Sequence, residues 1–155
     1  MSPVAIFYNV RSAENVGAMF RTADAAGVSR VYLAGYTPGP IDRFARPRKD
    51  IAKSALGAEK TLPWVHVESV AELVLDLKRN DYFVVAIEQA ENSVDYKKVE
   101  VKGKMAFIVG NEVSGIEKEI LELADVVAEI PMRGEKESLN VSTAFGIALF
   151  RILDK

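Results

Sequence analysis

The chain has 155 residues, a formal net charge of −2 and 49% hydrophobic residues, which is typical of one globular domain. It contains no cysteine and one histidine, so disulfide frameworks, cysteine-based zinc sites and thiolate nucleophiles are excluded. No apolar run approaches the ~20 residues of a membrane span, and no basic region followed by an apolar stretch opens the chain. We therefore expect a single domain over residues 1–155, without signal peptide or membrane association, in the cytoplasm.

The first half of the chain alternates short apolar runs with polar turns. In chain order the pattern predicts a strand at residues 4–8, a helix at 15–26, a strand at 30–35, part helix and part loop at 41–60, a strand at 64–67 and a helix from Ser69 to about residue 80. Gly27 suits the position that ends the first helix, because glycine adopts the left-handed conformation without strain. Ser69 can cap the later helix, and Glu72 completes a capping box.

The second half continues the alternation. It predicts strands at residues 82–87, 105–109 and 126–130, with a polar turn after the first of these, and helices at 116–123 and 139–153. Pro131 stops the last strand. Strands that alternate with helices predict an α/β fold with a mainly parallel sheet and helices on both faces.

The last predicted helix is apolar nearly all round. One stripe carries most of its apolar residues, and Ile147, Phe150 and Leu153 occupy the other side. A helix of this kind must be covered on all sides. We expect a symmetric dimer that uses this helix. The alternative is that the helix threads through the core of its own chain.

Three polar segments lie where predicted strands end or predicted helices begin. They are residues 15–21, residues 110–115, and residues 130–132 together with 138–142. In an open α/β sheet, ligands bind at such edges. The pattern therefore predicts one composite site built from distant parts of the chain.

The segment Gly110-Asn-Glu-Val-Ser-Gly115 has the layout of a phosphate loop without its chemistry. A phosphate loop continues with Lys and Ser or Thr, whereas Ile116 and Glu117 follow here, and the dinucleotide pattern Gly-x-Gly-x-x-Gly is absent. What remains is a glycine turn that lets a ligand approach the backbone, with Glu112 beside it. The alternative is a plain strand-to-helix turn in which Glu112 favours the helix N-terminus.

The other two segments also admit two interpretations. Ser138 or Asn140 can cap the last helix, and a second buried polar residue there would need a partner such as Glu112. Arg21 faces away from the apolar stripe of the first helix, where a guanidinium could bind an oxyanion or phosphate. Alternatively, Arg21 is an ordinary surface charge and Asn15 only a helix cap.

The remaining polar residues give weaker signals. His66 stands alone between two valines and is interpreted as a strand residue rather than a catalyst. Metal-ligating residues do not cluster in the sequence, so no metal site is expected. A basic stretch contains Arg43, Arg46, Arg48, Lys49 and Lys53, which taken alone could form a solvated face.

Taken together, the three segments resemble the SpoU-type (TrmH-like) RNA ribose 2′-O-methyltransferases of the SPOUT superfamily. The matching motifs are Asn15-x-Gly17-x-x-x-Arg21-Thr22-Ala23, Gly110-Asn-Glu112-x-x-Gly115, Ile130-Pro-Met132-x-Gly134 and Ser138-Leu-Asn140-Val-Ser142. The stretch Ser54-Ala-Leu-Gly-Ala-Glu59 is also similar to members of this group. The resemblance covers nearly the whole chain.

The resemblance implies a C-terminal trefoil knot, a homodimer through the first and last helices, and S-adenosylmethionine as methyl donor. The implied cofactor-binding residues are Ile87, Gly110, Ile130, Met132, Ser138 and Leu139. The implied catalytic residues are Arg21, Asn15, Glu112, Ser138 and Asn140. Models of such enzymes propose that the arginine accepts the proton of the ribose 2′-hydroxyl. Because a guanidinium group stays protonated in proteins, we instead assign Arg21 an electrostatic role, the stabilisation of negative charge on the ribose oxygen.

The resemblance also implies RNA as the substrate. We expect Arg21 and the basic stretch Arg43, Arg46, Arg48, Lys49 and Lys53 to contact phosphates, since the first motif leaves no room for an appended RNA-binding domain before it. Transfer RNA is favoured over ribosomal RNA. The alternatives are a non-catalytic RNA-binding module on the same fold and a base-directed SPOUT methyltransferase.

Overall fold

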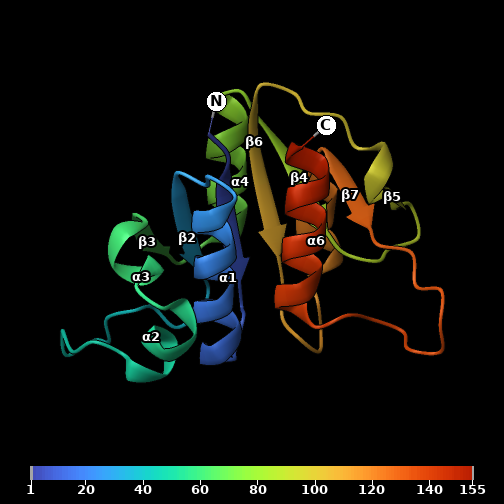
Figure 1. The fold of residues 1–155 in the computed structure, drawn as a ribbon. Coiled ribbons are helices and arrows are strands. Elements are labelled where there is room, and N and C mark those ends of the chain that lie inside the picture. Colours follow the sequence, from blue (N-terminus) through green and yellow to red (C-terminus); the bar gives the residue numbers. More distant parts are fainter. Residues whose placement is uncertain (1, 155) are drawn as a thin grey trace.

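The computed structural model describes residues 2–154 and has a seven-stranded sheet at its centre (Figure 1). The strands are β1 (Val4–Tyr8), β2 (Arg30–Ala34), β3 (Trp64–Val67), β4 (Tyr82–Ile87), β5 (Val94–Asp95), β6 (Lys104–Val109) and β7 (Val126–Glu129). They lie in the order β3-β2-β1-β6-β4-β7-β5, and each of these pairings is parallel. The predicted parallel sheet is confirmed, and the trefoil knot stays a prediction from the resemblance.

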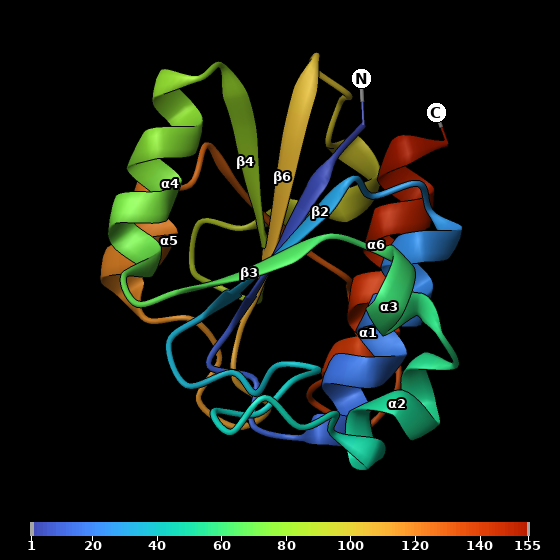
Figure 2. The ribbon, with the colours of Figure 1, turned by 90° about the vertical axis from the view of Figure 1, so that its left-hand side faces the viewer.

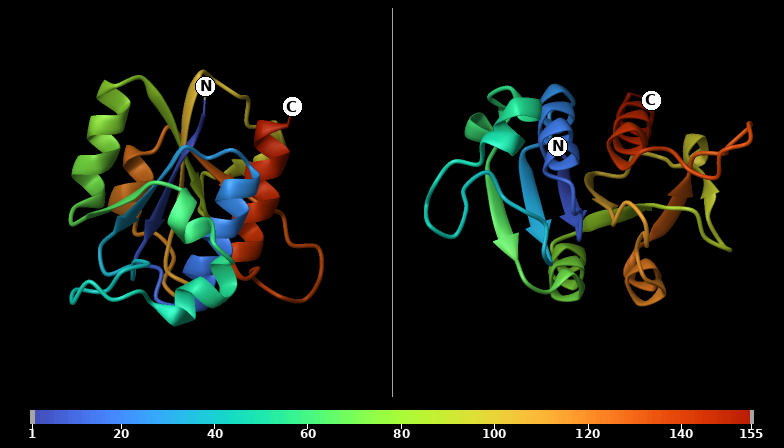
Figure 3. Two further views of the ribbon diagram at one scale, coloured as in Figure 1. Left: turned by 60° about the vertical axis from the view of Figure 1, so that its left-hand side comes forward. Right: turned by 90° about the horizontal axis from the view of Figure 1, so that it is seen from below.

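Helices cover both faces of the sheet, as expected (Figure 2). They are α1 (Ala13–Ala25), α2 (Lys49–Ala55), α3 (Ala58–Thr61), α4 (Val70–Arg79), α5 (Lys118–Leu123) and α6 (Val141–Leu153), with a short 3₁₀ helix, η1 (Tyr96–Lys98). The view along the strands separates α4 and α5 on one face from α1, α2, α3 and α6 on the other (Figure 3).

Each face of the sheet has its own apolar core, because side chains of a strand alternate between the two faces. Phe7 of β1 points toward α1 and α6, whereas Ile6 belongs to the core under α4 and α5. The ring of Phe7 makes edge contacts with Phe20 of α1, at 5.8 Å between centroids, and with Phe145 of α6, at 5.5 Å. These aromatic contacts hold α1 and α6 side by side on the sheet.

The largest differences from the sequence expectations lie at element ends. Helix α1 begins two residues before the predicted start, because the Ser12 hydroxyl accepts the backbone N–H of Asn15 at 3.1 Å and caps it. Helices α5 and α6 each begin two residues later than predicted. Strand β5 and helix η1 occupy a segment that contained only a predicted polar turn, and two residues are too few for an alternating pattern to reveal a strand.

Helix α6 is covered on one side by its own chain. Phe145, Leu149 and Ile152 are fully buried, whereas Ile147 and Phe150 remain 39% and 40% exposed. The core of the chain therefore buries one face of α6, as the alternative interpretation expected, and leaves the other face exposed. Within residues 2–154, no helix is long and apolar enough to cross a membrane.

Residue 17 is a glycine because α1 and α2 pack closely against each other at this position. Helix α2 crosses α1 there so closely that an added Cβ would lie 2.0 Å from Ser54 Oγ and 2.4 Å from the Ile51 carbonyl oxygen. The Ser54 hydroxyl also donates to the Glu14 carbonyl at 2.9 Å. Residues of two motifs, Gly17 and Ser54, thus form one helix–helix contact.

We predict that Gly17→Ala lowers the free energy of unfolding by about 1–3 kcal/mol, because the backbone of α2 has to move away from the new methyl group. Urea denaturation followed by circular dichroism measures the change. Gly134→Ala is the matched control, since no atom lies within 4 Å of its added Cβ. Equal stability of the two variants would contradict the packing role of Gly17.

Candidate functional site

A cavity of about 360 Å³ opens at the carboxyl ends of β4, β6 and β7. Its walls are the turn of residues 110–115, the segment of residues 128–139 and the first turns of α6. The carboxyl edge of a parallel sheet is where such folds bind ligands. Two of the three segments of the predicted composite site line this cavity, and the third reaches it only through the bond between Asn15 and Glu112.

All six predicted cofactor-binding residues line this cavity. They are Ile87, Gly110, Ile130, Met132, Ser138 and Leu139. Four of these six are apolar side chains, and the rest of the lining is largely polar, with the carboxylates of Glu88, Glu112, Glu129 and Glu137 among it.

The turn of residues 110–115 is too tight for side chains at its two glycines. A Cβ on Gly110 would lie 2.5 Å from Ile116 Cγ1 and 2.6 Å from the Gly115 carbonyl oxygen. Gly115 has a φ of +68°, and a Cβ there would lie 2.1 Å from a carboxylate oxygen of Glu88. Both glycines are therefore required by the packing of the turn against Ile116 and Glu88, and the approach of a ligand to its backbone stays a prediction.

Glu112 binds the first turn of α1. Its Oε1 accepts the backbone N–H of Arg11 at 2.9 Å, and its Oε2 accepts the backbone N–H of Ser12 at 2.8 Å and Nδ2 of Asn15 at 3.1 Å. Partial burial would raise the pKa of Glu112, but hydrogen bonds from these donors outweigh it, so the pKa lies below its ordinary value. Glu112 is therefore an ionised carboxylate at neutral pH, with its lone pairs directed at α1 and not at its own helix α5.

Asn140 extends this arrangement to α6. It is the N-cap of α6, where its Oδ1 accepts the backbone N–H groups of Ser142 and Thr143, and its Nδ2 donates to Asn15 Oδ1 at 3.2 Å. We call Glu112, Asn15 and Asn140 the polar chain. The expected direct contact between Asn140 and Glu112 is wrong, because Asn15 lies between them and bonds both.

The cap alternative for Asn15 is also wrong, since Ser12 caps α1 and leaves the Asn15 side chain for Glu112 and Asn140. Ser138 lies at the cavity wall.

Arg21 is exposed and lies six residues beyond Asn15 on α1, about 9 Å further along the helix axis. Arg21 is thus not part of the polar chain within one protomer.

The basic stretch lies at the same end of the sheet as the cavity, in the loop before α2 and on α2 itself (Figure 1). Arg43, Lys49 and Lys53 are exposed. Arg46 pairs with Asp42 at 3.1 Å and Arg48 pairs with Asp50 at 2.6 Å. Two of the five predicted RNA-binding cations are thus paired with carboxylates of the same stretch, and contact of the stretch with RNA stays a prediction.

Sequence reasoning missed two residues near the site. Glu88 lines the cavity after β4, and its carboxylate accepts the backbone N–H of Ile116 at 3.0 Å. The hydroxyl of Tyr8, at the end of β1, donates to Glu117, and burial together with this bond raises the pKa of Tyr8 to about 12. Both residues could have been found from the sequence, because Glu88 directly follows a predicted strand and Tyr8 ends one, and ligands bind at the ends of parallel strands.

His66 is exposed on strand β3, in keeping with its interpretation as a strand residue. Among residues 2–154, no group of three or more His, Asp or Glu side chains is placed to hold a metal ion. The expectation that the site uses no metal stays a prediction.

A parallel α/β sheet with this cavity at its carboxyl edge defines a class of ligand-binding domains, and comparisons with known proteins give the family. A model of the SpoU rRNA Methylase family matches residues 2–150, and the chain belongs to this family. The resemblance found in the sequence is thereby confirmed.

Curated relatives are longer than this chain. The 23S rRNA (guanosine-2′-O-)-methyltransferase RlmB of Xylella fastidiosa is 36% identical over 142 residues, which are 91% of this chain and 54% of that protein. A TrmH family protein of Staphylococcus saprophyticus is 32% identical over 155 residues, which are 100% of this chain and 59% of that protein. The chain thus spans less than two thirds of either relative.

Solved structures agree on the fold. The TrmH/SpoU tRNA modifying enzyme of A. aeolicus has a TM-score of 0.85 at 29% identity, covering 99% of this chain and 74% of that one. The AdoMet-bound rRNA methyltransferase of Sinorhizobium meliloti has a TM-score of 0.85 at 31% identity, covering 97% of this chain and 55% of that one.

We predict that Glu112→Gln lowers the free energy of unfolding at neutral pH by about 1–3 kcal/mol, because a glutamine offers one acceptor oxygen where the carboxylate uses two. The pKa of Glu112 is lowered on folding, so its contribution is present above the ordinary carboxyl pKa of 4.5 and is lost as pH falls through the lowered value. Urea denaturation at several pH values should show the two proteins converging in acid. Glu135→Gln, in an exposed loop, is the control, and a pH-independent difference for Glu112→Gln would contradict the assignment.

Proposed function

We propose that this protein transfers a methyl group from S-adenosylmethionine to a ribose 2′-hydroxyl of RNA. The observation that carries the proposal is the geometry at the carboxyl edge of the sheet. One cavity gathers all six residues expected to bind the cofactor, and the polar chain borders it through Glu112. Family membership and the names of the relatives support the same chemistry.

The cavity suits the proposed cofactor. Its volume of about 360 Å³ lies in the range of pockets for ligands of this size, roughly 300–1,000 Å³. The apolar side chains of Ile87, Ile130 and Leu139 would cover its apolar parts, and the polar residues of the turn of residues 110–115 would face its polar parts. Bound there, the cofactor would supply an electrophilic methyl group on a sulfonium.

The polar chain fixes the geometry beside this cavity. Because Glu112 bonds the first turn of α1 and Asn140 begins α6, the chain sets where both helices stand relative to the turn of residues 110–115. Alignment of the attacking oxygen by a rigid frame of this kind can contribute about 7–11 kcal/mol to lowering a barrier. We assign Glu112, Asn15 and Asn140 a positioning role and Ser138 a place at the cavity wall.

Arg21 would stabilise the negative charge that grows on the ribose oxygen during attack. Arg21 lies about 9 Å beyond Asn15 along the axis of α1 and is not among the residues that bond to the polar chain, so we propose that a partner protomer supplies it. The exposed apolar residues Ile147 and Phe150 on α6, beside α1, support a symmetric dimer through these two helices.

Transfer RNA is the proposed substrate, with ribosomal RNA as the alternative. The tRNA modifying enzyme of A. aeolicus is matched over 74% of its length, and the chain also matches the ribosomal RNA enzyme RlmB. Such an RNA substrate agrees with the cytoplasmic location expected from the sequence.

The proposed reaction is tested by its product. We expect incubation with S-adenosylmethionine carrying a tritiated methyl group to label transfer RNA more than ribosomal RNA, and digestion of the labelled RNA to release a 2′-O-methylnucleoside. A methylated base would instead identify a base-directed enzyme. Retention of RNA without any label would identify a non-catalytic binding module.

We predict that Arg21→Ala retains cofactor binding in calorimetry but lowers methyl transfer by about 10²–10³-fold, because the charge opposite the reacting oxygen is lost. Arg79→Ala, an exposed arginine on α4 at the other face of the sheet, is the matched control and should keep full activity.

Mixing two inactive variants tests whether Arg21 acts across the dimer. Exchange of protomers between Arg21→Ala and Asn140→Ala proteins should restore about a quarter of the wild-type activity, because half of the dimers are mixed and each mixed dimer regains one complete site. An inactive mixture that contains mixed dimers would mean that each protomer uses its own Arg21.

A further inference from the structure

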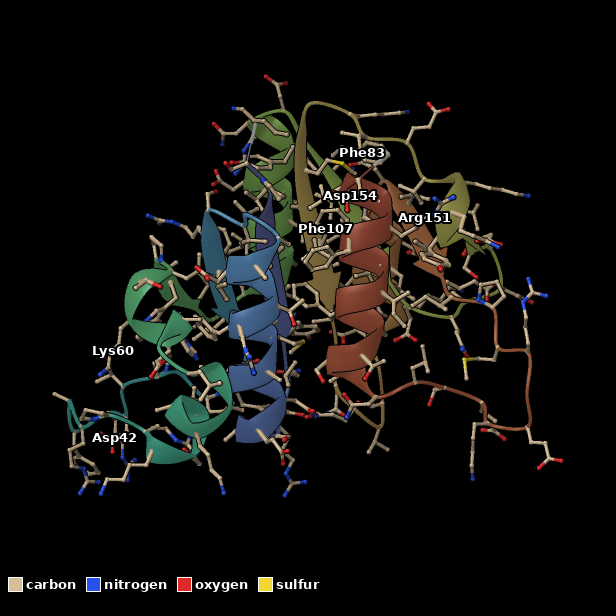
Figure 4. The ribbon with its side chains drawn as sticks, viewed as in Figure 1. Asp42, Lys60, Phe83, Phe107, Arg151 and Asp154 are labelled. Carbon is tan, nitrogen blue, oxygen red and sulfur yellow. The ribbon has the colours of Figure 1, made fainter. Side chains whose placement is uncertain are left out.

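The loop before α2 exposes an aromatic side chain at its tip. Phe44 is 63% exposed, so its ring is open to solvent and to a binding partner. It lies in the segment of residues 40–48, which we call the basic loop. Asp42 of this loop lies at the outer edge of the molecule (Figure 4).

The basic loop is folded tightly on itself. Asp42 Oδ1 accepts the backbone N–H groups of Phe44 at 2.8 Å and Arg46 at 3.0 Å, and the Asp42 N–H donates to the Arg46 carbonyl at 2.9 Å. Ala45 takes a φ of +60°, and Ile41 forms a bridge with Pro47. Phe44 is therefore presented on a structured tip and not on a flexible segment.

Two guanidinium groups flank the exposed ring. The Cζ atoms of Arg43 and Arg46 lie 4.9 Å and 5.0 Å from the centroid of Phe44. Arg46 donates through Nε to Asp42 Oδ2 at 3.1 Å, so this ion pair does not use its two terminal nitrogens. The tip thus combines an exposed aromatic ring with donors suited to phosphate oxygens.

This combination fits single-stranded RNA better than a protein partner. Bases stack on aromatic side chains when they are unpaired, and arginines beside the ring bind the connecting phosphates. Protein interfaces, in contrast, are depleted of charge at their cores. The basic loop follows the carboxyl end of β2, so it lies at the same end of the sheet as the cavity (Figure 1).

We propose that Phe44 stacks on an unpaired base of the RNA substrate while Arg43 and Arg46 hold the adjacent phosphates. The inference rests on RNA being the substrate of the proposed function. It makes Phe44 an RNA-binding residue that selects single-stranded regions, such as loops, over continuous duplex, whose bases are already stacked.

Fluorescence anisotropy with a labelled oligoadenylate of about 12 nucleotides tests the proposal. We expect Phe44→Leu to weaken binding about 5- to 100-fold, because leucine keeps apolar volume but has no aromatic face. Binding of the same ribose-phosphate strand without bases, and the dependence of binding on salt, should stay unchanged because both arginines remain. Phe44→Trp should retain affinity, and its fluorescence should be quenched by the oligoadenylate.

Phe83→Leu is the matched control. Phe83 also lies under a cation, with Lys102 Nζ 4.9 Å from its centroid, but it is the second residue of β4, at the opposite end of the strands from the basic loop. Its replacement should not affect RNA binding. Unchanged oligoadenylate affinity in Phe44→Leu would overturn the proposal, as would an equal loss for the strand without bases or a change of oligomeric state in sedimentation velocity. Oligoadenylate binding requires no catalysis, so absence of methyl transfer in the wild type would refute the proposed function alone.

Discussion

The carboxylate of Glu112 is the contact on which the candidate site depends. It lies in the turn after β6, yet its hydrogen bonds are to Arg11, Ser12 and Asn15 at the start of α1, about a hundred residues away in the chain. A carboxylate that accepts three N–H donors at a helix N-terminus is stabilised both by these bonds and by the helix dipole. Through Asn15 the same contact reaches Asn140 and fixes the beginning of α6.

Parallel strands make this convergence possible. Every strand of the sheet runs in the same direction, so the turns after β1, β4, β6 and β7 all emerge at one edge. The cavity takes its walls from three of these turns, and the polar chain connects them with the first turn of α1. Burial of Phe7 against Phe20 and Phe145 then holds α1 and α6 together behind the site. The core and the site are therefore stabilised by the same pair of helices.

Position in the sequence located three polar segments at strand ends or helix starts, and the parallel sheet brings residues 110–115 and 130–139 of these segments to one cavity. Gly110, Ile130 and Ser138 themselves were expected to bind the cofactor because of the family resemblance, and that role stays a prediction. The partner of each polar side chain could not be predicted, since it depends on three-dimensional distances. Asn15 illustrates this, because Ser12 and Asn15 can both cap a helix and only the structure shows which one does. The pairing of Arg46 with Asp42 was missed for a related reason, because a count of charges along a sequence does not reveal how a loop folds back on itself.

The close crossing of α1 and α2 at Gly17 has a mechanical consequence. Ser54 binds the Glu14 carbonyl, one residue before Asn15, and the two backbones touch where no side chain intervenes. A packed contact of this kind transmits displacement instead of absorbing it. Because α2 continues directly from the loop that carries Phe44, the contact at Gly17 joins that loop to the part of α1 that carries Asn15. A side chain at residue 17 would separate the two helices and break this connection.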